Sequence, residues 1–281
     1  MRNIWAKEKK DAIRRGAIHR APESRSTNES RMRAEKRGSV GTGLPAILFE
    51  DEAILAFDKP SGLLVAPDRW NKDLANLMQM VQQQVGPEIH NVHRLDRETS
   101  GVLLCTKGKE SLNHLSGQFQ AGTVKKCYIA IVLGRPPEDE MMVARPLQED
   151  PSAPGRMRIV RRGGKACETR LNLTRRWRGY SLVEAFPVTG RTHQVRVHLA
   201  CLGCPIVADS FYGDGRGLLL SSIKPGYKHK QDEERPLLGR LGLHARSLTI
   251  RHPRTGQIIT IESPLPREFE VAIKYLDRFV R

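Results

Sequence analysis

The sequence contains few aromatic and few acidic residues, and it has no long apolar run. Phe, Trp and Tyr make up 5% of the 281 residues, and 31 Asp and Glu stand against 47 Lys and Arg. No stretch approaches the roughly 20 apolar residues of a membrane-spanning helix. The N-terminus, "MRNIWAKEKK", lacks the apolar segment of a secretory signal. We therefore expect a cytoplasmic protein with no membrane partner.

Cysteine is also scarce, and its arrangement argues against disulfides and metal. The five cysteines are an odd number, and most lie in apolar runs, as reduced core cysteines do. The "CLGC" segment at 201–204 offers two ligands, whereas a structural zinc site needs four. We expect no metal.

The abundant feature is positive charge. The net charge is +16 and the sequence pI is about 10.0. Such a field attracts polyanions, and RNA or DNA ranks ahead of acidic lipids because no amphipathic membrane-surface helix stands out. A basic protein with no polyanionic partner is the alternative that composition alone leaves open.

The charge is concentrated at the N-terminus. Residues 1–42 hold 12 Lys or Arg and 5 Asp or Glu, with few large apolar residues. We interpret them as a flexible basic arm that contacts phosphates without sequence preference, or as a solvated tail. From residue 43 the sequence pattern changes to short β-like runs separated by turn residues, so residues 43–281 are expected to form one folded domain.

Within this domain the pattern predicts many strands and few helices. Helices are expected over 73–85, over "KESLNHLSGQFQAG", over about 192–203 and at the C-terminus. Strands are expected at 47–50 and 53–58, in "GVLLCTK" and "KKCYIAIVLG", and in two later hairpins, while 135–160 and 214–240 read as surface loops. This tally predicts an α+β fold around a mixed, largely antiparallel sheet.

One carboxylate stands out in "NVHRLDRETSGVLL", residues 91–104. Asp96 lies between Arg94 and Arg97, and opposite charge favours its ionised form. Such a group can serve as a nucleophile, a general base or a metal ligand. From spacing alone, an ion-paired aspartate in a turn is the preferred interpretation.

A second dense segment is "VTGRTHQVRVHLACLGCPIVADSFYG", residues 188–213. An arginine near the start of its predicted helix, Arg196, is available to bind a carboxylate or a phosphate. The "GDGRG" segment that follows lacks the flanks of a dinucleotide-binding motif.

Five motifs in order resemble those of the RluA-like family of pseudouridine synthases. They are "ILFEDEAILAFDKPSGLLV", "HRLDRETSGVLL", "KKCYIAIVLG", "TGRTHQVRVHLACLGCPIVADSFYG" and "LHARSLTIRHPRTG", and they run from about Leu44 to about Pro266. Any one of them alone would be weak. From the sequence we expect two departures from many relatives: no S4-type RNA-binding domain, and a 214–240 loop of its own.

The resemblance implies a pseudouridine synthase fold with a cleft across the sheet, residues 43–281 as the catalytic domain, and conversion of uridine in RNA to pseudouridine without a cofactor. Asp96 matches the essential aspartate, which attacks the ribose or the uracil or assists glycal formation. Arg196 matches its partner, and Tyr128 matches the residue that stacks on the base and takes the C5 proton. Arg94 matches a residue that enters the RNA stack.

In the late motif the resemblance implies an apolar contact to uracil, and it does not say which leucine makes it. The candidates for substrate binding are Leu243, His244 and Leu248. Neighbouring motif residues are expected to shape turns and not to touch substrate: His93, Thr99, Ser100, Gly101, Arg191 and His193.

Three hypotheses follow. The first is a monomeric pseudouridine synthase acting on structured RNA, with ribosomal RNA preferred to tRNA. The second is an RNA-binding chaperone or assembly factor that kept the fold and lost the reaction. The third, a DNA-binding regulator, is weaker because no helix-turn-helix or zinc-finger spacing is present.

Overall fold

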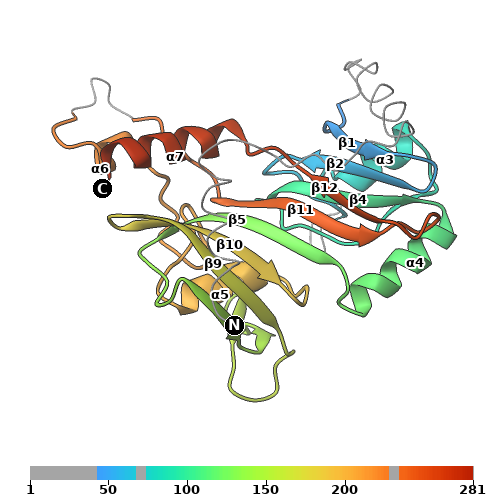
Figure 1. The fold of residues 1–281 in the computed structure, drawn as a ribbon, viewed down its shortest axis with the longest axis horizontal. Coiled ribbons are helices and arrows are strands. Elements are labelled where there is room, and N and C mark those ends of the chain that lie inside the picture. Colours follow the sequence, from blue (N-terminus) through green and yellow to red (C-terminus); the bar gives the residue numbers. More distant parts are fainter. Residues whose placement is uncertain (1–42, 68–73, 228–233, 281) are drawn as a thin grey trace, which may run out of the picture. The chain divides into compact units, whose positions relative to one another are not determined.

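The structure is a computed structural model, and it describes residues 43–67, 74–227 and 234–280 (Figure 1). The predicted basic arm, residues 1–42, lies outside this range. The elements follow in this order: β1 Ile47–Glu50, β2 Ile54–Lys59, α3 Leu77–Gln84, β3 Ile89–Asn91, β4 Ser100–Lys107, α4 Lys109–Gln120, β5 Lys125–Leu133, β6 Glu140–Ala144, β7 Leu147–Glu149, β8 Met157–Ile159, β9 Glu168–Trp177, β10 Tyr180–Pro187, α5 Gln194–Cys201, α6 Leu220–Ile223, β11 Leu243–Arg251, β12 Ile258–Glu262 and α7 Arg267–Phe279.

Ten strands form one mixed, mostly antiparallel sheet, which confirms the predicted α+β class. Eight of them run in the order β1-β2-β4-β11-β5-β10-β9-β6, with β12 paired to β11 and β3 paired to β4. The β4–β11 pair is parallel and short, with His244 opposite Ser100 and Ala245 opposite Gly101. Strands β7 and β8 form a separate hairpin within the segment that we expected to be a surface loop.

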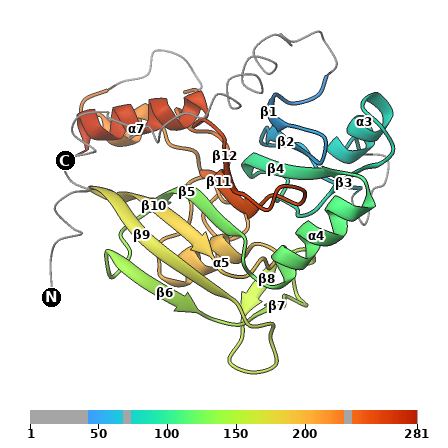
Figure 2. The same cartoon turned by 45° about the vertical axis from the view of Figure 1, so that its right-hand side comes forward.

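Helices cover both faces of the sheet (Figures 1 and 2). On one face, α3 packs into a core cluster with Leu55, Phe57 and Leu103, and α5 packs into another with Ala130 and Val183. On the other face, α4 and α7 pack on clusters that include the alternate residues of the same strands. This alternation is what strands buried on both faces require.

Local signals account for the helix ends. The side chain of Asn76 caps α3 by accepting a hydrogen bond from Gln79 N at 3.0 Å, three residues after the predicted start of this helix at residue 73. After α4, Gly122 adopts a φ of 69°, a left-handed conformation that ends the helix as its position predicts.

The parallel joint between β4 and β11 depends on a glycine. Gly101 has a φ of 112°, and a Cβ built on it would lie 2.2 Å from the carbonyl oxygen of Ala245. No side chain fits there, so Gly101 allows the two strands to approach. The loop that carries Asp96 leads directly into this joint.

We predict that Gly101→Ala lowers the free energy of unfolding by about 3 kcal/mol or more, because it combines backbone strain with a clash against backbone. Urea denaturation measures the change. Gly117→Ala is the matched control, since Gly117 lies in α4 with no heavy atom within 4 Å of the added Cβ. It should stabilise the protein by up to about 1 kcal/mol. Equal midpoints for Gly101→Ala and the unmodified chain would contradict the packing argument.

Candidate functional site

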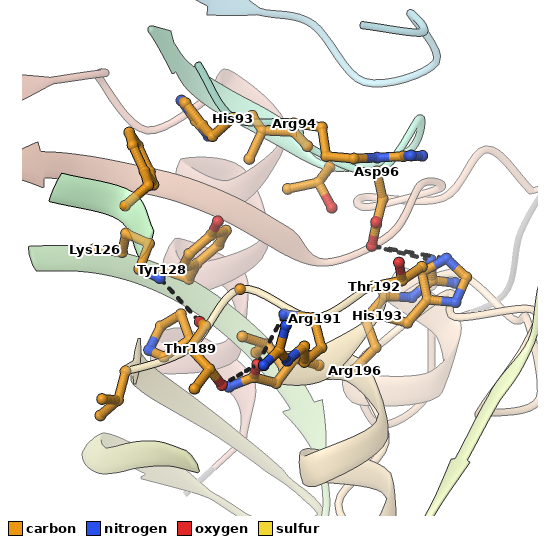
Figure 3. A pocket seen from close by; sticks show the side chains of 18 of the residues that line it. His93, Arg94, Asp96, Lys126, Tyr128, Thr189, Arg191, Thr192, His193 and Arg196 are labelled. Atoms are coloured by element: carbon orange, nitrogen blue, oxygen red, sulfur yellow. Dashed lines mark hydrogen bonds and ion pairs between the residues drawn. The ribbon is translucent and has the colours of Figure 1, made fainter. Parts of the chain in front are cut away.

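A pocket of about 530 Å³ lies on the sheet face that carries α3 and α5. One wall is the segment between β3 and β4, which contains Asp96, and the opposite wall is the segment leading into α5 (Figure 3). Tyr128 of β5 lies between them and packs against the core clusters of both helices. The pocket thus spans the seam between two halves of the sheet, with room for a nucleoside-sized ligand.

Arg196 is the cation that faces Asp96. Its Nη1 lies 3.5 Å from Asp96 Oδ2, while Nε and Nη2 donate to the two oxygens of Asp209 at 2.8 and 2.9 Å. The side chains of Arg196 and Asp209 are 1% and 0% exposed, so this bidentate pair is out of water. The sequence placed Arg196 correctly on the helix near its start, at the third residue of α5.

The two arginines beside Asp96 in the sequence have other roles. Arg97 is exposed, and its Nε donates to the carbonyl of Gly62 at 3.0 Å. Arg94 is exposed and lines the pocket. Sequence neighbours were therefore a poor guide to the charge partner of Asp96, which comes from 100 residues further along the chain.

The charge of Arg196 is secured by its neighbours. Burial alone would lower the pKa of this guanidinium, but the hydrogen bonds and charge of Asp209, together with Asp96 and Glu98, raise it. Its Nη1 is one of two buried polar side-chain atoms without a hydrogen-bond partner among the described residues. The guanidinium therefore keeps one unsatisfied donor directed at Asp96 and the pocket.

Side chains of the segment "KPSG", residues 59–62, form hydrogen bonds to the backbone of the segment that carries Asp96. Lys59 is fully buried, and its Nζ donates to the carbonyls of Pro60, Leu63 and Arg97 at 2.9, 2.8 and 3.0 Å. Burial lowers the pKa of Lys59 to about 8. The Ser61 hydroxyl adds a hydrogen bond to the carbonyl of Glu98 at 2.6 Å. Sequence reasoning quoted this segment only as part of a longer motif and missed its part in fixing the loop.

Tyr128 presents its ring to the pocket (Figure 3). Burial, reinforced by the negative charge of Asp96, raises the pKa of its hydroxyl well above the usual value for tyrosine. At neutral pH the side chain is therefore an uncharged phenol. Nearby, Lys126 Nζ donates to the carbonyl of Thr189 at 2.9 Å, and burial lowers the pKa of this lysine to about 8.

The late-motif candidates separate onto two faces of β11. Leu243 is buried beside α5 and lines the pocket. Leu248 packs in the α4 cluster on the other face. His244 is fully buried between Ser100 and Ser263, and it does not line the pocket. Opposite parity of Leu243 and Leu248 in one strand is a sequence signal that could have separated them.

The residues expected to shape turns also divide. His93 is structural in its contacts: it stacks on Phe119, its Nε2 accepts from Leu104 N at 3.0 Å, and burial lowers its pKa to about 3. Ser100 and Gly101 lie in the β4–β11 joint. Arg191 and His193 line the pocket, and His93 and Thr99 do so as well.

Comparison with known proteins agrees with this geometry. Residues 53–201 match the family model for RNA pseudouridylate synthase. The chain belongs to the RNA pseudouridylate synthase family. It is 39% identical over 231 residues to the ribosomal large subunit pseudouridine synthase C of Pasteurella multocida, covering 80% of this chain and 65% of that protein. It is 36% identical over 220 residues to the dual-specificity RNA pseudouridine synthase RluA of Salmonella typhi, covering 78% of this chain and 92% of that protein.

Solved structures show the same fold. Human RNA pseudouridylate synthase domain containing 4 superposes with a TM-score of 0.65 at 28% identity, covering 89% of this chain and 98% of that one. The first curated relatives are longer, and this chain spans about 58 to 65% of their length. Among the described residues, no helix is long and apolar enough to cross a membrane.

We predict that Arg196→Met lowers the free energy of unfolding by about 3–5 kcal/mol, because it leaves the Asp209 carboxylate buried without its partner. The same change at Arg175, whose ion pair with Asp277 is about half exposed on both sides, should cost at most about 1 kcal/mol. Urea denaturation of the two variants measures the difference. A loss at position 196 no larger than that at 175 would show that the buried pair contributes little.

Proposed function

We propose that this chain is an RNA pseudouridine synthase that isomerises specific uridines of large-subunit ribosomal RNA, with Asp96 as the catalytic carboxylate. Family membership and the names of the relatives support the reaction and the RNA class. The observation that carries the proposal is the environment of Asp96. Its carboxylate faces the Arg196 Nη1 donor, which has no hydrogen-bond partner among the described residues, and it lines the same pocket as Tyr128.

Asp96 has the properties of a reactive carboxylate. No hydrogen bond to either of its oxygens is found among the described residues, and its side chain is 18% exposed. Arg196 lies on the Oδ2 side, which leaves Oδ1 for the substrate. An ionised oxygen that is not tied up by hydrogen bonds suits attack on C1′, attack on the uracil ring and proton removal from the ribose alike. We leave these three routes open.

The reaction needs no cofactor by its own balance. The N1–C1′ bond breaks, a C5–C1′ bond forms, one proton leaves C5 and one joins N1. The product is an isomer of the substrate, so no atom or electron is supplied from outside. We therefore propose a cofactor-free reaction in which the side chains position the base and move protons.

The pocket residues suit a flipped uridine. The phenol ring of Tyr128 offers a face for stacking, and Leu243 supplies the apolar contact that the late motif implies. We assign this contact to Leu243 alone, because His244 and Leu248 do not line the pocket. Arg94 at the exposed edge can occupy the gap that the flipped base leaves, which offsets part of the unstacking cost.

A second RNA substrate is favoured by one observation. This chain covers 92% of a relative whose name gives it dual specificity. We propose transfer RNA as the second candidate, after ribosomal RNA. Specificity among RNAs of this kind depends on loop shape and backbone contacts.

We predict that Asp96→Asn abolishes pseudouridine formation, because the amide keeps the shape and removes the charge. Pseudouridine mapping of ribosomal and transfer RNA from cells lacking the protein, rescued with each variant, measures this and names the sites. Glu98→Gln is the matched control: its carboxylate also faces Arg196, at 3.9 Å, but is 44% exposed and does not line the pocket. It should restore the sites. Rescue by Asp96→Asn, or no site dependent on the protein, would favour the RNA-binding alternative.

We predict that Tyr128→Phe binds RNA within a few-fold of the unmodified chain but reacts at least about 100-fold more slowly if the hydroxyl takes the C5 proton. Phe keeps the stacking surface and removes only the hydroxyl. Single-turnover rates and filter binding on one identified RNA separate the two effects. An unchanged rate would restrict Tyr128 to stacking, and Tyr128→Leu, which also removes the ring, should then weaken both properties.

A further inference from the structure

His193 lies in the pocket wall in an unusual conformation. Its φ is 54°, a left-handed value that only one other described non-glycine residue, Ala208, shares. Such a conformation is unfavourable for a residue with a Cβ and persists where surrounding contacts fix it. The ring of His193 has Nε2 3.9 Å from Asp96 Oδ2 (Figure 3). Its side chain is 11% exposed.

The other ring nitrogen is held by Tyr212. The Tyr212 hydroxyl lies 2.8 Å from His193 Nδ1, and the backbone N–H of Met157 donates to the same hydroxyl at 2.8 Å. Tyr212 also lies edge-on to the histidine ring, with centroids 5.6 Å apart. Met157 is the first residue of β8, so the hairpin β7–β8 reaches the site through this hydrogen bond.

The hydrogen bonds of the Tyr212 hydroxyl favour one direction at His193. The Met157 N–H can only donate, so the Tyr212 oxygen accepts from it. The hydroxyl has one proton, and among the described residues His193 Nδ1 is the acceptor within its reach. If the oxygen accepted from Nδ1 as well, the hydroxyl proton would have no acceptor among the described residues. The arrangement that satisfies this proton has Nδ1 as the acceptor, and a neutral imidazole then carries its proton on Nε2, which faces Asp96.

The electrostatics agree with a neutral ring. Burial lowers the pKa of His193 below its ordinary value, against the raising effect of Asp96, so the ring is uncharged at pH 7. Burial also raises the pKa of Tyr212 to about 12, which keeps its hydroxyl protonated and able to donate. The charged groups nearest the imidazole are Asp96, Arg196, Asp209 and Glu98.

We propose that Tyr212 and the β7–β8 hairpin fix His193 as the Nε2–H tautomer, so that this N–H and Arg196 Nη1 both donate to Asp96 Oδ2 once RNA is bound. The present 3.9 Å separation is too long for a hydrogen bond, and catalytic hydrogen bonds often shorten in the substrate complex. Two donors on one oxygen leave Oδ1 as the reacting atom.

Asp209 positions both donors. Its two oxygens accept from Arg196, and Oδ1 also accepts from the backbone N–H groups of Phe211 and Tyr212 at 2.9 and 3.1 Å. One buried carboxylate thus fixes the guanidinium directly and the imidazole through Tyr212. Tyr212 is a positioning residue in this arrangement, because it contacts His193 and does not line the pocket.

The tautomer can be measured without RNA. In the full chain labelled with ¹⁵N-histidine, long-range ¹H–¹⁵N spectra at pH 7 should show His193 with an unprotonated Nδ1 and a protonated Nε2, the signals being assigned by their loss in His193→Gln. Tyr212→Phe should shift both nitrogens towards averaged values. Tyr275→Phe, on α7, is the matched control and should leave them unchanged. A protonated Nδ1 in the unmodified chain, as the other tautomer or as imidazolium, would overturn the proposal.

The catalytic part rests on the proposed function, and its failure is distinguishable. In single-turnover reactions on the identified RNA, Tyr212→Phe should lower the rate at least about ten-fold with RNA affinity unchanged. Thermal melting and the other histidine signals establish that this variant is folded. If the tautomer is lost but the rate is kept, the proposed role of His193 is wrong. If the unmodified chain forms no pseudouridine, the proposed function fails while the tautomer result stands.

Discussion

The buried guanidinium of Arg196 constrains the arrangement of the whole site. A charge taken out of water is costly unless it is paired and hydrogen-bonded, and Asp209 satisfies two of its nitrogens. The third, Nη1, has no hydrogen-bond partner in the described part of the chain and lies 3.5 Å from Asp96. The fold thus holds a cation that is stabilised by one carboxylate and directed at another. A buried Nη1 without a hydrogen bond lowers the stability of the fold, but it leaves an N–H donor available to Asp96 in the pocket.

The position of Asp96 depends in turn on the sheet joint behind it. Gly101 admits β4 against β11, and the buried Ser100 hydroxyl lies 3.0 Å from His244 Nδ1 across that joint. On the near side, Lys59 binds the carbonyl of Arg97. The Asp96 segment is therefore held at both ends by buried polar contacts, while its carboxylate has an ion-pair partner in Arg196 but no hydrogen bond among the described residues. A preorganised catalytic site requires this kind of arrangement, in which the backbone is fixed and the carboxylate is not already hydrogen-bonded.

Sequence reasoning predicted the fold class, the strands around the motifs, the helix carrying Arg196 and the C-terminal helix, because hydrophobic periodicity and turn residues act locally. It could not identify Asp209 as the partner of Arg196, since that pairing depends on a turn whose backbone N–H groups bind the same carboxylate. It also assigned His193 to a turn. The role that we propose for it depends on Tyr212 and on a hairpin more than 30 residues upstream, and no local pattern encodes that contact.

The acidic groups near Asp96 gather around one cation. The chain carries a net charge of +16, yet three carboxylates, Asp96, Glu98 and Asp209, face the single guanidinium of Arg196. In the proposed RNA complex, phosphates are therefore disfavoured at Asp96 and favoured at the rim, where Arg94 and Arg191 are exposed. The electron-poor C1′ of the ribose, in contrast, would be stabilised beside the Asp96 carboxylate. In that complex the same charge distribution would direct the base and its sugar, and not the phosphates, towards Asp96.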